Sequence, residues 1–226
     1  MTFHQRPGSR RGWPLALAGA ALCGTLLSGC GAIIVGGVVV GSALVATDRR
    51  TTGAQVDDET IEVKSSSRMS ETFADRARID TTSYNRLVLL TGEVPTAEDK
   101  TRAEQVVARV PNVSAVVNEI TVGPLNTFGE RSKDTYITTK VKTSLVDAKD
   151  LFANSIKVTT HRGVVYLMGR VTEREATRAS EVARGVGGVV KVVRVFEVLS
   201  ESELAQTQPK TLAQPDTAAS AAVVRP

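Results

Sequence analysis

The chain has 226 residues, 28 lysines and arginines, 24 acidic residues and a formal net charge of +4. Arg6, Arg10 and Arg11 supply three of those charges, so the chain beyond them is nearly neutral. A nucleic-acid-binding surface would need a basic run with interleaved aromatics, which is absent from the sequence. Two cysteines and two histidines are too few for a metal cluster or a Ser-His-Asp triad. We therefore expect no metal, no cofactor and no nucleic acid.

An uncharged run follows the basic N-terminus and leads to a cysteine. Residues 15–27 are apolar, and two small residues follow them, as a signal peptidase requires. The segment Leu27-Ser-Gly-Cys30 resembles a bacterial lipobox. This resemblance implies that residues 1–29 are a lipoprotein signal peptide and that Cys30 is the lipid-attachment residue, carrying acyl chains such as palmitate. Gly31 in place of an aspartate favours the outer membrane, with the protein facing the periplasm.

An uncleaved membrane anchor is the alternative. Residues 12–47 carry no charge, and this run is longer than the ~20 residues that a spanning helix needs. Glycines and β-branched residues dominate residues 31–46, however, and they make a poor helix. With cleavage, one cysteine leaves with the leader and the other carries lipid, so neither a thiol nor a disulfide remains.

Two later stretches of the chain resemble each other. Residues 79–94 align with residues 156–171, and in that alignment Gly92 falls on Gly169. The match extends on both sides, which indicates a tandem duplication. The expected segments are a signal peptide (1–29), a lipid-anchored linker (30–56) with slack in 47–55, a first domain (57–123), a linker (124–132), a second domain (133–200) and a disordered tail (201–226).

Hydrophobic periodicity changes in the same order within each copy. In the second copy Ile137, Val141 and Leu145 form one stripe of a helix that Asp134 would cap. The expected elements that follow are strands at 156–159 and 164–168 with a glycine turn at 161–163, a helix from Thr172, and a third strand at 189–198. Gly92 and Gly169 are expected to be structural, at strand ends where a Cβ would not fit, with ligand contact as the alternative.

This αββαβ order resembles that of BON domains. The strands Val88-Leu-Leu-Thr-Gly-Glu-Val94 and Val165-Tyr-Leu-Met-Gly-Arg-Val171 and the valine-rich last strands carry the resemblance. It implies an α+β fold of two tandem BON domains, each a three-stranded sheet packed against two helices, after a lipoprotein signal peptide. With the lipobox, residues 53–60, 134–141 and 171–176 are similar to the outer-membrane lipoproteins that contain two BON domains.

The carboxylates do not indicate an enzyme. They lie mainly at helix starts and on solvent faces, whereas acid/base chemistry needs buried or closely paired acids. A binding module is the better interpretation. On the first helix of the second unit, the surface beside the inward stripe combines an aromatic, two lysines and hydroxyls, which suits an anionic lipid surface. The residues of this predicted surface are Tyr136, Thr139, Lys140, Lys142, Thr143 and Val146.

The resemblance implies a related set of contacts. In similar proteins this helix recognises phosphatidylglycerol and cardiolipin, and the matching positions here are Tyr136, Lys140, Val141, Lys142, Leu145 and Val146. Tyr136 stands where the family has tryptophan, which should weaken insertion. The resemblance also implies support of envelope integrity at the division site. Two alternatives remain: a solvated helix face without a ligand, and a structural adaptor that binds envelope proteins.

Overall fold

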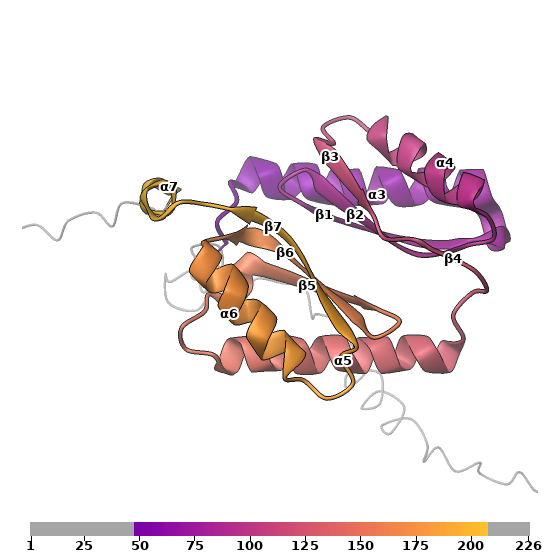
Figure 1. The fold of residues 1–226 in the computed structure, drawn as a ribbon. Coiled ribbons are helices and arrows are strands. Elements are labelled where there is room, and N and C mark those ends of the chain that lie inside the picture. Colours follow the sequence, from indigo (N-terminus) through magenta and orange to yellow (C-terminus); the bar gives the residue numbers. More distant parts are fainter. Residues whose placement is uncertain (1–47, 208–226) are drawn as a thin grey trace, which may run out of the picture. The chain divides into compact units, whose positions relative to one another are not determined.

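The computed structural model describes residues 48–207. They form two αββαβ units followed by a short helix (Figure 1). Both units show the expected α+β architecture. The predicted signal peptide, Cys30 and most of the predicted tail lie outside the described residues. None of the described helices is long and apolar enough to cross a bilayer.

The first unit is built around the central strand β2. Strand β1 pairs with β2 in antiparallel fashion, and β3 and β4 both pair with β2 in parallel. The expected third strand is therefore split into β3 and β4. The elements are α3 (Thr52–Phe73), η1 (Ala74–Arg76), β1 (Arg78–Tyr84), β2 (Leu87–Val94), α4 (Ala97–Ala108), β3 (Ala115–Asn118) and β4 (Thr121–Val122).

The second unit repeats this plan with an unbroken third strand. The sheet order is β5-β6-β7, and α6 forms the crossover that the parallel pair β6 and β7 requires. The elements are α5 (Phe128–Asp147), η2 (Ala153–Ser155), β5 (Ile156–His161), β6 (Val164–Val171), α6 (Glu173–Arg184) and β7 (Lys191–Val198). Helix α7 (Glu201–Thr207) follows.

The start of α5 differs from the prediction. The helix begins at Phe128, inside the segment predicted to be a linker, because Thr127 and Glu130 form a capping box. Asp134 is therefore not a cap. It is buried in the second turn of the helix, where its carboxylate accepts the backbone N–H groups of Arg162 and Gly163, each at 2.8 Å. Asp134 thus fixes the tight turn between β5 and β6.

Asp58 of α3 has the same role in the first unit. Its carboxylate accepts the backbone N–H groups of Asn85 and Arg86 at 2.7 Å, the Ser83 hydroxyl at 2.7 Å and the Arg50 guanidinium at 2.8 Å. Burial alone would raise the pKa of Asp58, but these hydrogen bonds outweigh it and the pKa lies below its ordinary value. A buried carboxylate therefore joins helix and hairpin in both copies.

Gly169 and Gly92 lie within strands and not at their ends, since β6 continues to Val171 and β2 to Val94. The neighbouring backbone approaches closely at both positions. A Cβ on Gly169 would lie 2.3 Å from the carbonyl oxygen of Ser155, and one on Gly92 would lie 2.0 Å from a backbone oxygen of β1. A side chain has no room at either site unless the neighbouring backbone moves.

The central strands are buried on both faces. In β6, Val165 and Leu167 pack into the unit's own core, whereas Tyr166 and Met168 belong to a separate cluster. That cluster joins the two units, because its members are Tyr84, Leu89, Tyr166, Met168 and Val195. Because successive side chains of a strand point to opposite faces of the sheet, each central strand contributes to two hydrophobic cores.

Charged groups lie at the edge of this joint core. The carboxylate of Glu93, on β2, is fully buried, and it is 3.1 Å from Nε of Arg162 and 3.0 Å from Nε2 of His161. Arg162 also donates to the carbonyl of Pro124 at 2.7 Å. A carboxylate held this deeply needs such partners. The β5–β6 hairpin therefore binds the first unit as well as its own helix.

The segment predicted to give the tether slack is attached to the fold from Asp48 onwards. Arg49 makes two hydrogen bonds to the buried carboxylate of Glu175, at 2.6 and 2.7 Å. Arg50 pairs with Asp58, and its guanidinium lies 4.3 Å from the ring centroid of Tyr84. Helix α3 then begins after the cap Thr51. Composition was misleading here because the two arginines find buried acidic partners.

The predicted tail begins with a helix. Ser200 caps α7, since its hydroxyl accepts the N–H of Glu203 and the carboxylate of Glu203 accepts the N–H of Ser200. Leu204 is buried. The disorder prediction is therefore wrong for residues 201–207, and the Ser-x-x-Glu spacing was the sequence signal for this helix.

We predict that Gly169→Val lowers the free energy of unfolding by about 3 kcal/mol, because backbone must move to admit the side chain. Thermal and urea unfolding would measure this. Gly129→Ala is the control, since a Cβ there has nothing within 4 Å. Equal stability of the two variants would contradict the steric account.

We also predict that Asp58→Asn destabilises the protein by about 1–3 kcal/mol at neutral pH, because an amide cannot accept all of these donors. The pKa of Asp58 is lowered from 3.8, so its contribution is complete above about pH 4 and is lost as the pH falls further. The variant should therefore lose less stability between pH 4 and pH 2. Urea titrations across this range would measure the difference, with the exposed Glu59→Gln as control. The prediction would be disproved if the free energy of unfolding fell equally between pH 4 and pH 2 in Asp58→Asn and in the parent protein.

Candidate functional site

Helix α5 carries the predicted binding surface. Its inward stripe, Ile137, Val141 and Leu145, lies in the core of the second unit and is almost inaccessible to solvent. Val141 and Leu145 were predicted to contact lipid, and this part of the prediction is wrong for the folded state. Their side chains fill the core, so they would reach a ligand only if α5 left the sheet.

The remaining predicted residues lie on the accessible side of α5. Tyr136 is 65% exposed and Val146 is 66% exposed. Thr139, Lys142 and Thr143 are exposed, and Lys140 is half-buried. We call these six residues the α5 face: Tyr136, Thr139, Lys140, Lys142, Thr143 and Val146.

Lys140 is held in place within this face. Its Nζ donates to the carbonyl of Gly187 at 3.1 Å and lies 5.4 Å from the ring centroid of Tyr136. An ammonium has three N–H groups, so two remain for another acceptor. Among the described residues, no ion pair involves Lys140 or Lys142 within 4.0 Å, so both charges are available to an anion.

The threonines of the face are already engaged. Thr139 donates its hydroxyl to the carbonyl of Thr135 at 3.0 Å, and Thr143 donates to the carbonyl of Thr139 at 3.0 Å. Such bonds to the preceding turn use the hydroxyl proton. The lysines of the α5 face therefore keep N–H groups that can bind a ligand, whereas the hydroxyl protons of the two threonines are already used within the helix.

Sequence reasoning missed an aromatic at the beginning of α5. Phe128 is 78% exposed, and the guanidinium of Arg131 lies 5.8 Å from its ring centroid. It was missed because the helix was expected to begin only after Asp134, seven residues later. The Thr127-x-x-Glu130 pattern was the signal that would have included it.

The corresponding helix of the first unit lacks this character. Lys64 aligns with Lys140, but three serines follow it and Ser65 is buried. Thr60, at the position of Tyr136, is a small polar side chain. The accessible side of α3 thus lacks the ring and the second lysine of the α5 face.

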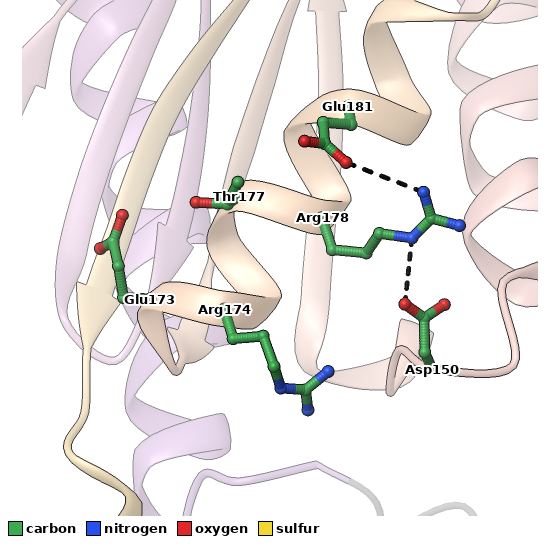
Figure 2. A pocket seen from close by; sticks show the side chains of 6 residues that line it. All are labelled: Asp150, Glu173, Arg174, Thr177, Arg178 and Glu181. Carbon is green, nitrogen blue, oxygen red and sulfur yellow. Dashed lines mark hydrogen bonds and ion pairs between the residues drawn. The ribbon is translucent and has the colours of Figure 1, made fainter.

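An open groove lies on another surface of the second unit, between α6 and the loop that follows α5. Figure 2 shows its lining, in which Arg178 points toward Asp150 and Glu181. Nε of Arg178 is 3.0 Å from the Asp150 carboxylate, and the contact with Glu181 is 3.8 Å. These groups neutralise one another at the surface. The arrangement offers neither a nucleophile with a base nor a buried acid pair.

His161 is the single histidine in the described part of the chain, and its Nε2 lies 3.0 Å from the Glu93 carboxylate. No set of three His, Cys, Asp or Glu side chains that could hold a metal ion occurs among the described residues.

Comparison with known proteins identifies both units. The BON domain profile matches residues 57–124 and 133–200. The chain is 40% identical over 175 residues to the outer membrane lipoprotein DolP of Haemophilus influenzae, covering 76% of this chain and 90% of that protein. It is 37% identical over 151 residues to a 21 kDa hemolysin of Actinobacillus pleuropneumoniae, covering 66% and 78%.

A solved structure of CdsD, a structural protein of the type III secretion system of Chlamydia trachomatis, matches over 71% of this chain and 99% of that one, but with 15% identity and a TM-score of 0.28. The profile and the sequence relatives suffice, because the matched domains coincide with two αββαβ units. The chain belongs to the BON domain family, as a non-enzymatic outer membrane lipoprotein with two BON domains.

Proposed function

We propose that the protein is anchored by acylated Cys30 and binds anionic phospholipids through the α5 face, in support of envelope integrity at the division site. The observation that carries this proposal is the pairing of an exposed ring with an ammonium that has no ion-pair partner among the described residues. Tyr136 and Lys140 are one helical turn apart, and Nζ of Lys140 lies 5.4 Å from the ring centroid of Tyr136. A tyrosine side chain has an apolar ring and a polar hydroxyl, which suits the headgroup region of a bilayer, and the lysine ammonium attracts lipid phosphate.

The anchor and the face have different tasks in this proposal. Buried acyl chains contribute ~0.8 kcal/mol per CH₂, so two or three chains hold the protein at the membrane almost permanently. Two lysines contribute about 1 kcal/mol each near an anionic surface. The α5 face therefore does not recruit the protein. It selects where on the membrane the anchored domains lie, and phosphatidylglycerol and cardiolipin are the proposed partners.

We expect Lys140→Glu with Lys142→Glu to weaken binding of a soluble form, beginning at Leu44, to phosphatidylglycerol liposomes by at least about 30-fold at low salt. Flotation or backbone amide shifts would measure binding. Lys64→Glu with Arg102→Glu is the matched control, since it makes the same charge change on exposed residues of the first unit. If both variants lost binding equally, the loss would be explained by the change in net charge and not by a site on α5. Undiminished binding by the α5 variant would disprove the lipid site.

Anchoring at Cys30 has its own test. Blocking lipoprotein signal peptidase should cause a larger precursor to accumulate, and Cys30→Ala should do the same, because the thiol must be acylated before cleavage. Electrophoresis of whole cells would show the shift. If neither treatment changes the mobility, the N-terminal segment is an uncleaved membrane anchor, and attachment through Cys30 fails.

A structural adaptor for envelope proteins is the competing function. It would use a charged surface such as the groove lined by Asp150, Arg174 and Arg178. Capture of a stoichiometric envelope protein, together with unchanged amide shifts on addition of phosphatidylglycerol, would favour the adaptor over lipid binding.

A further inference from the structure

The polypeptide that leads from Cys30 joins the folded part at one fixed place. Arg49 binds the carboxylate of Glu175 with two hydrogen bonds and donates to the carbonyl of Arg170 at 2.9 Å. A side-chain hydrogen bond from Arg170 returns to the carbonyl of Arg49 at 3.3 Å. Arg49 and Glu175 are both buried, and bidentate geometry restricts their orientation. The attachment point is therefore fixed by buried contacts.

This place adjoins the loop that follows α5. The guanidinium of Arg49 lies 5.4 Å from the ring centroid of Phe152. Despite this contact, Phe152 remains 51% exposed. Lys149 is exposed in the same loop, and the exposed Val146 lies on the last turn of α5. We call these three residues the tether-side surface: Val146, Lys149 and Phe152.

The length of the preceding chain limits how far this surface can lie from the bilayer. Seventeen residues, 31–47, separate Cys30 from Asp48, and a fully extended chain of that length spans at most about 60 Å. The end of the second unit that holds Arg49 is thus the end attached to the anchor. An exposed aromatic, an aliphatic side chain and a lysine form a composition suited to the membrane interface.

The charges around Phe152 set the kind of contact. Lys149 is flanked by Asp147 and Asp150, and Asp150 pairs with Arg178 at 3.0 Å (Figure 2). The loop therefore has no net positive charge to attract an anionic membrane. Any attraction to lipid must come from apolar side chains, which depends little on headgroup charge or on salt.

We propose that the tether-side surface is a second membrane contact, in which Phe152 enters the headgroup region of the bilayer beside the attachment point of the tether. The proposal rests on acylation at Cys30 but not on lipid selection by the α5 face. The two contacts share Val146 at their border but differ in chemistry: the lysines of the α5 face respond to anionic lipid, and Phe152 of the tether-side surface responds to any bilayer.

Tryptophan fluorescence can test this directly. Trp13 is the only tryptophan and precedes Cys30, so the mature protein has none. Phe152→Trp reports on the tether-side surface, Tyr136→Trp on the α5 face, and Val63→Trp on α3, where Val63 is 62% exposed, serves as control. Each lipidated full-length variant is reconstituted into phosphatidylcholine vesicles, with or without phosphatidylglycerol, that contain brominated acyl chains.

We expect the Phe152→Trp emission to shift to shorter wavelength and to lose most of its intensity in both lipid mixtures and at high salt. Val63→Trp should be unaffected. Quenching of Phe152→Trp no greater than that of Val63→Trp would overturn the proposal, as would quenching that requires phosphatidylglycerol. Tyr136→Trp distinguishes the tether-side contact from lipid binding by the α5 face, because quenching of Tyr136→Trp should require phosphatidylglycerol and should disappear at high salt.

A second measurement excludes the possibility that the introduced tryptophan itself causes the contact with the bilayer. Once Cys30 is acylated, the mature protein has no free thiol, so Lys149→Cys can be spin-labelled selectively. Its accessibility to oxygen should rise, and its accessibility to a water-soluble nickel chelate should fall, on reconstitution. A label that stays fully accessible to the nickel chelate would also overturn the proposal.

Discussion

Burial of the central strands on both faces is the constraint on which the other features depend. Strands β2 and β6 each contribute alternate side chains to their own helices and to the cluster that joins the two units. Neither sheet can then expose its second face. Ligand-binding surfaces must therefore be formed by helices and loops, and the side of α5 that points away from its sheet is the accessible surface with an aromatic and two lysines.

Buried carboxylates connect these layers. Asp58 and Asp134 occupy matching positions on the first helix of each copy, and each fixes a hairpin turn through backbone N–H groups. The turn residues adopt positive φ, including Arg86 and Arg162, which costs energy for a residue with a Cβ. Two charge-assisted hydrogen bonds per turn offset that cost. The same β5–β6 hairpin presents Arg162 to Glu93, so helix, turn and joint core depend on one another.

Local patterns predicted much of this fold. The αββαβ order of elements, the glycine turn at Gly163 and the start of α6 after Thr172 all follow from residues close in sequence, where turn chemistry and capping act. The errors concern partners that are distant in sequence. The role of Asp134 depends on a hairpin 28 residues later, and that of Arg49 on Glu175, 126 residues away. Periodicity contains no information about such pairs.

The candidate site divides in the same way. Helical spacing correctly separated Ile137 from Tyr136, but the resemblance to related proteins added Val141 and Leu145, which the fold requires for its core. In the proposed arrangement the acyl chains provide the attachment, so weak contacts suffice for orientation, and the chemistry of those contacts determines which lipids they can sense. A lysine-rich face distinguishes lipid charge, whereas an aromatic in a neutral loop does not. Placing the second kind of contact beside the fixed attachment of Arg49 would bring the domains to the bilayer at one end and leave the α5 lysines free to respond to composition.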